Sequence, residues 1–355
     1  MTARARKMPA EGFPLRTVSR TMIRNCWWSM WLGLSLLLLV ASSAAQTCQS
    51  AADMEAATRT ALETTAKRYF EMAAHGDTAS LKQNAIPSLA GGFAGVEAAV
   101  KDNQASLTGA QATVRPPFLL SADGPQPLPH GEFLCGVFGR EGQTKDSAVF
   151  VLNNLPPGKY AVTVLDVSGG GASAVTLTLV LQQIGADWKL GGFYAKASQT
   201  TGHDAAWFVQ RARDFKAKSQ MHNASLYYLQ AIALSTPVDF MSTLATDKLY
   251  DEAKSTQTAD LPANGNAVDI SAGGKTYHMT EVFPLAVGKD LDVVVKYQSP
   301  DISDSARTFQ DNTALIKALV AKFPEFREAF GGVVARAVDP SGHDYGTLLA
   351  MKDIK

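Results

Sequence analysis

Residues 182–196 read QQIGADWKLGGFYAK, and this stretch decides the fold of the first half of the chain. Two apolar segments, 174–184 and 188–196, flank the turn-forming residues Gly185, Ala186 and Asp187. A connection this short predicts a β-hairpin, because only neighbouring antiparallel strands can be joined by so few residues.

The segments before this hairpin predict more strands and, ahead of them, helices. Runs rich in Val, Thr, Leu, Phe and Tyr are separated by turn-forming residues at 112–120, 132–138, 147–152 and 159–167. Residues 51–75 and 93–104 carry apolar side chains at helical spacing, and Gly76 ends the first of these helices. Helices that precede an antiparallel meander predict an α+β domain over residues 48–197, with the helices packed on a curved sheet.

The leading helix, which runs into AAHGDTASL at residues 73–81, and the closing hairpin together resemble the nuclear-transport-factor-2-like (cystatin-like cone) superfamily. This resemblance covers roughly residues 50–197 and implies a cone that Trp188 plugs and Phe193 lines. It makes Trp188, Phe193, Tyr69 and Asp166 the candidates for a ligand pocket. The superfamily contains both binding proteins and enzymes, so the fold alone does not define an activity.

Enzymes of that superfamily place an Asp or a His–Asp pair inside the cone, and the corresponding candidates here are Asp166, His130 and Asp146. Asp166 stands beside a Gly-rich turn, however, which favours a solvated carboxylate over a catalytic one. The sequence contains no GxSxG, HExxH or CxxC motif, and SGGGAS at 168–173 lacks the Lys of a phosphate-binding loop. We therefore expect no catalytic residue, no metal and no cofactor.

Residues 203–254 are predicted to form a helical bridge. Within 204–237, large, small and aromatic residues follow the spacing of a single tetratricopeptide-like hairpin, and these are Phe208, Ala212, Phe215, Ala224, Tyr228, Ala231 and Pro237. One such unit cannot bury its own faces, so it must pack on its neighbours. An ordinary helical hairpin is an equally good interpretation.

The polar segment STQTADLPANGN at 255–266 predicts a linker and the main domain boundary. Beyond it, residues 267–355 are expected to form a small α+β domain of no recognised family. Its predicted elements are a hairpin over 267–271 and 275–282, a strand at 291–297, a helix at 306–323 with a further turn at 325–330, and a hairpin over 333–338 and 345–351.

Residues 1–45 predict a secretory signal peptide, because basic residues precede the apolar run WLGLSLLLLV and small residues follow it. Met22 is an alternative start, and an uncleaved membrane anchor is the alternative to a cleaved leader. Cys48 and Cys135 remain after cleavage. They either form a disulfide, as an oxidising compartment permits, or leave Cys135 as a buried thiol.

The amino-acid composition excludes one further class of function, nucleic-acid binding. The chain has 355 residues, 46% of them hydrophobic, with 33 basic and 33 acidic residues. The first 45 residues are basic, so the remainder is mildly acidic and lacks the electrostatic footprint of a nucleic-acid-binding protein. The sequence thus predicts an exported protein of the bacterial periplasm or envelope. We expect a non-enzymatic module for a small apolar ligand or an envelope protein partner. The alternatives are a hydrolase or isomerase with a carboxylate in the cone, and a purely structural envelope component.

Overall fold

The computed structural model describes residues 46–138, 142–263 and 265–355, so the predicted leader lies outside the described residues. The fold is α+β, as predicted. Its first sheet is antiparallel, with the order β1-β3-β6-β7-β8, and β2 pairs with β6 beside β3. The strands are β1 (Gln46–Gln49), β2 (Gln111–Val114), β3 (Phe118–Ala122), β6 (Gly158–Ser168), β7 (Val175–Ile184) and β8 (Asp187–Ala197).

The β7–β8 hairpin forms where the sequence predicts it. Gly185 has a φ of 62°, a left-handed conformation that glycine adopts without strain. The strand predicted at 112–120, by contrast, is divided into β2 and β3. Pro116 and Pro117 lie at the break and have no N–H for a ladder bond, which explains why the strand stops and restarts.

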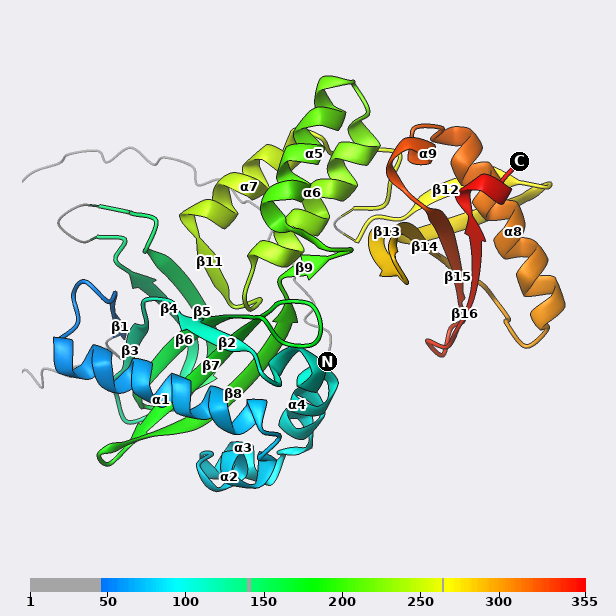
Figure 1. Ribbon diagram of the computed structural model, residues 1–355. Helices are drawn as coiled ribbons and strands as arrows, with labels where there is room; N and C mark the ends of the chain where they lie inside the picture. Colours follow the sequence, from blue (N-terminus) through cyan, green and yellow to red (C-terminus); the bar gives the residue numbers. More distant parts are fainter. Residues whose placement is uncertain (1–45, 139–141, 264) are drawn as a thin grey trace, which may run out of the picture. The chain divides into compact units, whose positions relative to one another are not determined.

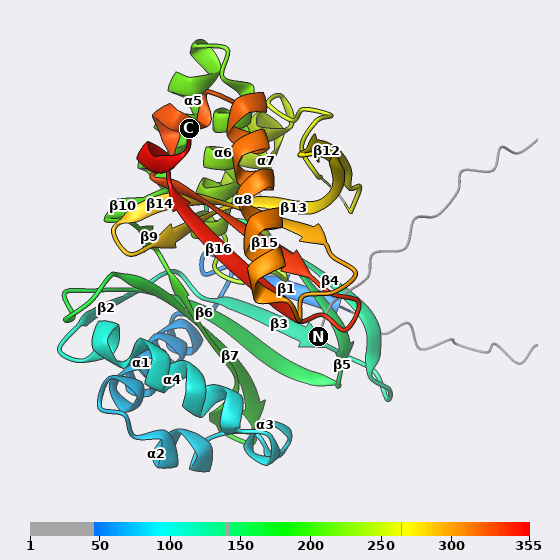
Figure 2. The same cartoon turned by 90° about the vertical axis from the view of Figure 1, so that its right-hand side faces the viewer.

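Helices cover one face of this first sheet, as Figure 2 shows. They are α1 (Ala56–Ala74), α2 (Thr78–Gln83), α3 (Pro87–Gly91) and α4 (Ala94–Leu107). The buried stripe of α1 matches the apolar spacing of its sequence: Leu62, Ala66, Tyr69, Phe70 and Ala73. The chain leaves α1 through Gly76, and the Asp77 side chain caps α2 by accepting a hydrogen bond from the backbone N–H of Ser80.

A second, smaller sheet packs on the opposite face. It has the order β11-β5-β4, formed by β4 (Leu128–Cys135), β5 (Ala148–Leu155) and β11 (Met241–Thr243). Its apolar cluster includes Phe133, Phe150 and Met241 together with Leu120 and Val162 of the first sheet. A disulfide between Cys48 and Cys135, whose Cα atoms are 4.8 Å apart, joins β1 to β4.

The bridge is a helical hairpin followed by a third helix. It consists of α5 (Ala205–Ala217), α6 (Met221–Ser235) and α7 (Leu244–Lys254), preceded by the short strands β9 (Gln199–Thr200) and β10 (His203–Asp204). The residues at tetratricopeptide-like positions in α5 and α6 are buried between the helices. The bridge is not purely helical, because after Pro237 the chain forms β11 and extends the second sheet.

The C-terminal part is a five-stranded sheet with the order β12-β13-β14-β15-β16. Its elements are β12 (Val268–Ala272), β13 (Lys275–Val287), β14 (Asp290–Gln298), α8 (Ser305–Lys322), α9 (Phe326–Ala329), β15 (Gly332–Val338), β16 (Asp344–Ala350) and a 3₁₀ turn (Met351–Asp353). Strands β14 and β15 are parallel, because α8 lies between them in the chain and carries it back across the sheet (Figure 1).

The C-terminal sheet and the helical bridge share one hydrophobic cluster. Phe208 and Tyr228 of the bridge belong to it, as do Val293, Leu319 and Val333 of the C-terminal part. The polar segment 255–266 contributes buried residues of its own, Thr256 and Leu261. Segment 255–266 therefore lies where the helical bridge gives way to the C-terminal sheet, but it does not separate two hydrophobic cores. None of the described helices is both long and apolar enough to cross a membrane.

Candidate functional site

The interior between the first sheet and its helices is filled by its own side chains. The structure brings Trp188, Phe193 and Tyr69 together there, with exposed fractions of 8%, 6% and 0%. The Tyr69 hydroxyl donates to the backbone oxygens of Trp188 at 3.0 Å and Asn84 at 3.1 Å. Burial raises the pKa of Tyr69, so the hydroxyl keeps its proton for these bonds. The three aromatic candidates therefore form a packed core.

Asp166 is not part of this group. It lies on β6 with its side chain half exposed, outside the helix-facing cluster. Arg115 binds its carboxylate with two hydrogen bonds, of 2.6 and 2.9 Å. The position of Asp166 beside a turn in the sequence suggests such a paired, solvated carboxylate. The structure places it on the face of the sheet opposite the helices. It is not placed to act in the space between the first sheet and its helices.

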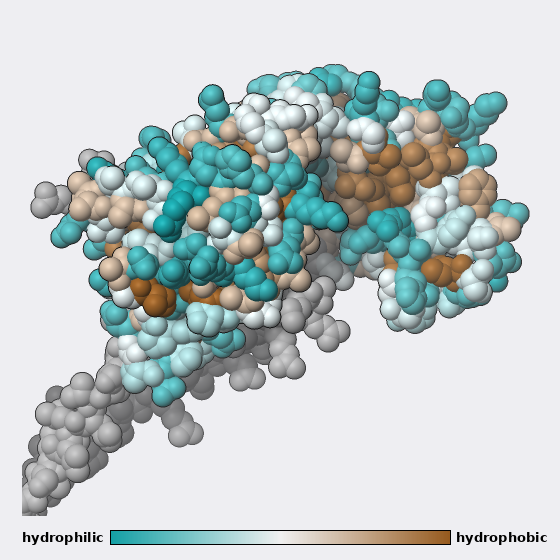
Figure 3. All heavy atoms as spheres, turned by 60° about the horizontal axis from the view of Figure 1, so that its bottom comes forward, coloured by the Kyte–Doolittle hydropathy of each residue, from teal (hydrophilic) through white to brown (hydrophobic). Residues whose placement is uncertain are grey.

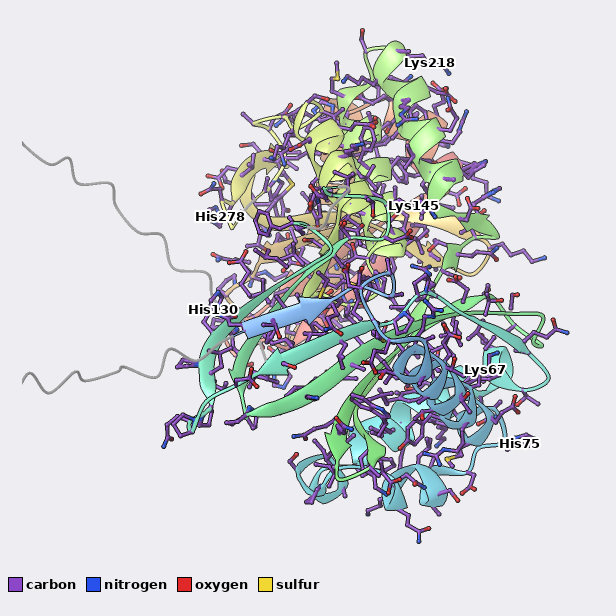
Figure 4. The ribbon with its side chains drawn as sticks, turned by 90° about the vertical axis from the view of Figure 1, so that its left-hand side faces the viewer. Lys67, His75, His130, Lys145, Lys218 and His278 are labelled. Atoms are coloured by element: carbon purple, nitrogen blue, oxygen red, sulfur yellow. A yellow bond between two sulfur atoms is a disulfide. The ribbon has the colours of Figure 1, made fainter. Side chains whose placement is uncertain are left out.

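His130 and Asp146 also lie away from the helix-facing core. His130 is an exposed residue of β4 whose Nδ1 is 2.8 Å from Oδ1 of Asn153 on β5. Figure 4 shows it on the side of the molecule opposite α1, where Lys67 and His75 are labelled. Asp146 is exposed in the turn before β5. The three candidate acid–base residues therefore do not converge. In the described ranges, no group of three or more His, Cys, Asp or Glu side chains is arranged to hold a metal ion.

A cavity of about 960 Å³ lies on the face of the C-terminal sheet that α8 leaves open. Its floor is polar and contains basic side chains from three adjacent strands, namely His278, Lys296 and Arg336. Each has a carboxylate partner: His278 pairs with Asp269 at 2.6 Å, Lys296 with Glu281 at 2.8 Å, and Arg336 with Asp344. The three basic side chains therefore each have a carboxylate partner, whereas Asp339, which also lines the cavity, has only His343 as a basic partner among the described residues, with Nδ1 3.7 Å from its Oδ2.

A second cavity, which we call the α6 groove, is of a different kind. It has a volume of about 520 Å³ and is bounded by β5, α6, β11 and α7. Its lining is mostly apolar and consists of Val149, Val151, Lys196, Leu229, Ile232, Ala233, Thr236, Asp239, Phe240, Met241, Ser242, Thr246 and Tyr250. This volume falls within the roughly 300–1,000 Å³ of pockets that hold small ligands.

The α6 groove gathers large apolar side chains that the fold leaves in contact with solvent. Val151, Leu229 and Tyr250 are 38%, 44% and 48% exposed, although they come from β5, α6 and α7. Scattered exposed apolar residues are normal, whereas a concentrated group indicates a binding surface. Figure 3 shows that apolar surface is collected in patches on the face it displays.

The backbone around the α6 groove already has its hydrogen-bond partners. Helices α6 and α7 bond internally, β5 pairs with β11, and the N–H of Val151 donates to the carbonyl of Phe240 at 2.9 Å. Lys196 lies at one end and donates to the carbonyl of Thr236 at 3.0 Å, where it caps the C-terminus of α6. The groove thus offers contact area and very few free polar groups.

The sequence patterns did not predict this groove. The available signal was in α6, where apolar residues occur on every side of the helix rather than on one stripe. Such a pattern indicates that a helix has contacts on more than one face. The pattern does not show which segment one of these faces meets. In the structure that segment is β5, residues 148–155, which pairs with β11 beyond the end of α6.

No family model, no curated protein and no solved structure matches this chain.

Proposed function

We propose that this protein is a non-enzymatic binding module of the bacterial cell envelope that holds an apolar ligand in the α6 groove. The observation that carries the proposal is the convergence of Val151, Leu229 and Tyr250, all partly exposed, on one cavity. Burying such side chains under an apolar ligand is favourable by about 25 cal/mol per Å² of apolar surface removed from water.

The chemistry of the groove favours a hydrocarbon-rich ligand over an extended peptide. A peptide strand would bring its own N–H and C=O groups into a site whose backbone is already bonded, and each unpaired group is costly. A flexible apolar chain has no such groups. A partner helix satisfies its own backbone and is the competing occupant, so the experiment below must distinguish the two.

Two features support export and the cone architecture. The disulfide between Cys48 and Cys135 suits an oxidising compartment, in agreement with the predicted leader at 1–45. Helices on one face of an antiparallel sheet that ends in the β7–β8 hairpin agree with a nuclear-transport-factor-2-like first domain. In this proposal the cone is a scaffold and the ligand binds elsewhere.

The test combines native mass spectrometry with a binding titration. Protein purified gently from its own envelope should retain a small-molecule mass that is lost on unfolding. The neutral apolar dye N-phenyl-1-naphthylamine should bind to the emptied protein, and Val151→Glu or Tyr250→Glu, both at residues that line only the α6 groove, should weaken that binding at least about tenfold, or about 1.4 kcal/mol. Leu285→Glu is the matched control, because Leu285 is similarly exposed, at 44%, but lies outside the groove.

Three results would overturn the proposal. The first is equal dye binding by all variants, which would place the apolar site elsewhere. The second is a retained polypeptide in place of a small molecule, which would assign the groove to a partner helix. The third is a protein that retains no ligand and binds no dye, as expected for a purely structural component.

A further inference from the structure

Strand β16 forms an edge of the C-terminal sheet and is bonded on one side only. It pairs with β15 from Asp344 to Ala350. At the ends of this ladder, the N–H of Asp339 donates to the carbonyl of His343, and that of Met351 to the carbonyl of Gly331. The odd-numbered residues of β16 therefore face β15, because inward and outward backbone groups alternate in an antiparallel ladder.

The even-numbered residues accordingly present their backbone to the outside. They are Asp344, Gly346, Leu348 and Ala350. No other described residue hydrogen-bonds to the N–H or C=O groups of the first three, whereas the C=O of Ala350 begins the 3₁₀ turn Met351–Asp353. Soluble proteins usually protect such an edge with lysine, proline or a bulge. Strand β16, DYGTLLA, has neither residue type, and its register with β15 is regular throughout.

Exposed apolar side chains flank this edge on both faces of the sheet. Leu348 is 48% exposed and alternates with Thr347, whose Oγ1 accepts a hydrogen bond from Asn312 of α8. Leu348 therefore lies on the face away from α8. Phe309 of α8 is also 48% exposed. Viewed down the axis of α8, Phe309 and Asp311 lie on opposite sides of Asn312. Asp311 bonds to β13, so Phe309 lies on the side of α8 nearer β16.

We propose that β16 pairs antiparallel with β16 of a second copy of this chain, with the two-fold axis passing through Thr347. This register places outward-facing residues opposite one another, Gly346 with Leu348 and Asp344 with Ala350. Like charges do not meet, and the small Gly346 leaves space for the Leu348 side chain of the other copy. The interface is isologous and closes both edges, which explains why neither copy needs a protective charge there. The proposal is independent of the α6 groove.

The first experiment cross-links the full chain at the axis. Two Thr347 residues would form a pair without backbone bonds, with Cα atoms about 4.5 Å apart, close enough for a disulfide. Thr347→Cys should therefore give a disulfide-linked dimer on mild oxidation, with the 347–347 junction identified by peptide mass mapping. Ala350→Cys is the control, because its two copies would be about 20 Å apart.

The second experiment measures molar mass by light scattering across a dilution series. Leu348→Pro removes an outward N–H without removing a bond to β15, and Leu348→Lys adds a protective charge. Each should weaken the dimer at least about tenfold. The proposal is overturned by a monomer at every concentration or by a dimer unaffected by both variants. Equal cross-linking at 347 and 350, or a 347 cross-link to a different protein, would also overturn it.

Discussion

The Tyr69 hydroxyl donates a hydrogen bond to the backbone oxygen of Trp188, 119 residues further along the chain. This contact joins the first helix to the closing hairpin of the sheet. It also explains why the space between the first sheet and its helices is filled, since Tyr69 reaches through the space that a ligand would need. The same hydroxyl donates to the carbonyl of Asn84, so one side chain connects three segments.

Replacing Tyr69 with Phe should lower the free energy of unfolding by about 1–3 kcal/mol, because the buried bond to the Trp188 carbonyl is lost while the ring still packs. The Asn84 carbonyl keeps the hydrogen bond from the N–H of Leu190. Urea unfolding followed by circular dichroism measures the change. Tyr250→Phe is the control, since Tyr250 is 48% exposed, and its effect should stay within about 0.5 kcal/mol. An equal effect of both variants would show that the Tyr69 hydroxyl does not stabilise the fold.

Removing the disulfide should destabilise the first domain strongly. Cys48 and Cys135 are 87 residues apart, and closing a loop of that length is worth roughly 4–5 kcal/mol in the chain-entropy model. The double variant Cys48→Ala/Cys135→Ala should show this loss in urea unfolding. Dithiothreitol should produce the same loss in the wild type and no further loss in the variant. An effect of the reductant on the double variant would mean that another bond is involved.

His222 holds the bridge to the C-terminal part through two carboxylates. Its Nδ1 bonds to Glu325, and its Nε2 lies 2.9 Å from Asp260; the His222 and Glu325 side chains are 16% and 19% exposed. His222→Gln should cost about 1–3 kcal/mol, because it leaves a largely buried carboxylate without its partner. His278→Gln breaks the exposed pair with Asp269 and should cost less than about 1 kcal/mol. Equal losses in chemical unfolding would contradict this difference.

A pH dependence should arise between α5 and α7. Hydrogen bonds from Arg213, at 2.7 and 2.9 Å, hold the pKa of Glu252 below its usual value, despite partial burial, which acts in the opposite direction. Because the folded-state pKa is lowered, this pair stabilises the protein fully above the unfolded pKa of about 4.3 and is lost as pH falls through the folded value.

Arg213→Met should therefore be less stable than the wild type at pH 7, by at most about 1 kcal/mol because both groups are partly exposed. The difference should disappear at pH values well below about 4. Urea unfolding at both pH values measures it, and Lys254→Met, which breaks an exposed i,i+3 pair, is the control. A difference that persists in acid would assign the effect of Arg213 to packing.

Much of the architecture could be predicted from local patterns. The β7–β8 hairpin, the buried stripe of α1 and the order of elements after residue 267 follow from side-chain periodicity and turn-forming residues, which act over a few positions. The candidate site could not be predicted in this way. The family resemblance makes Trp188 and Tyr69 candidates for a ligand pocket, but whether they line a cavity or fill it depends on packing between segments 119 residues apart in the sequence.

The amino-acid sequence by itself determined the α+β class, the closing hairpin and the pairing of helix with sheet, because periodicity and turn chemistry are local. Only the tertiary structure decided where apolar surface remains exposed. The α6 groove exists because β11 returns from the bridge to pair with β5, and the open edge of β16 exists because no described segment covers it. Both depend on which distant segments meet, and a residue's neighbours in sequence do not specify that.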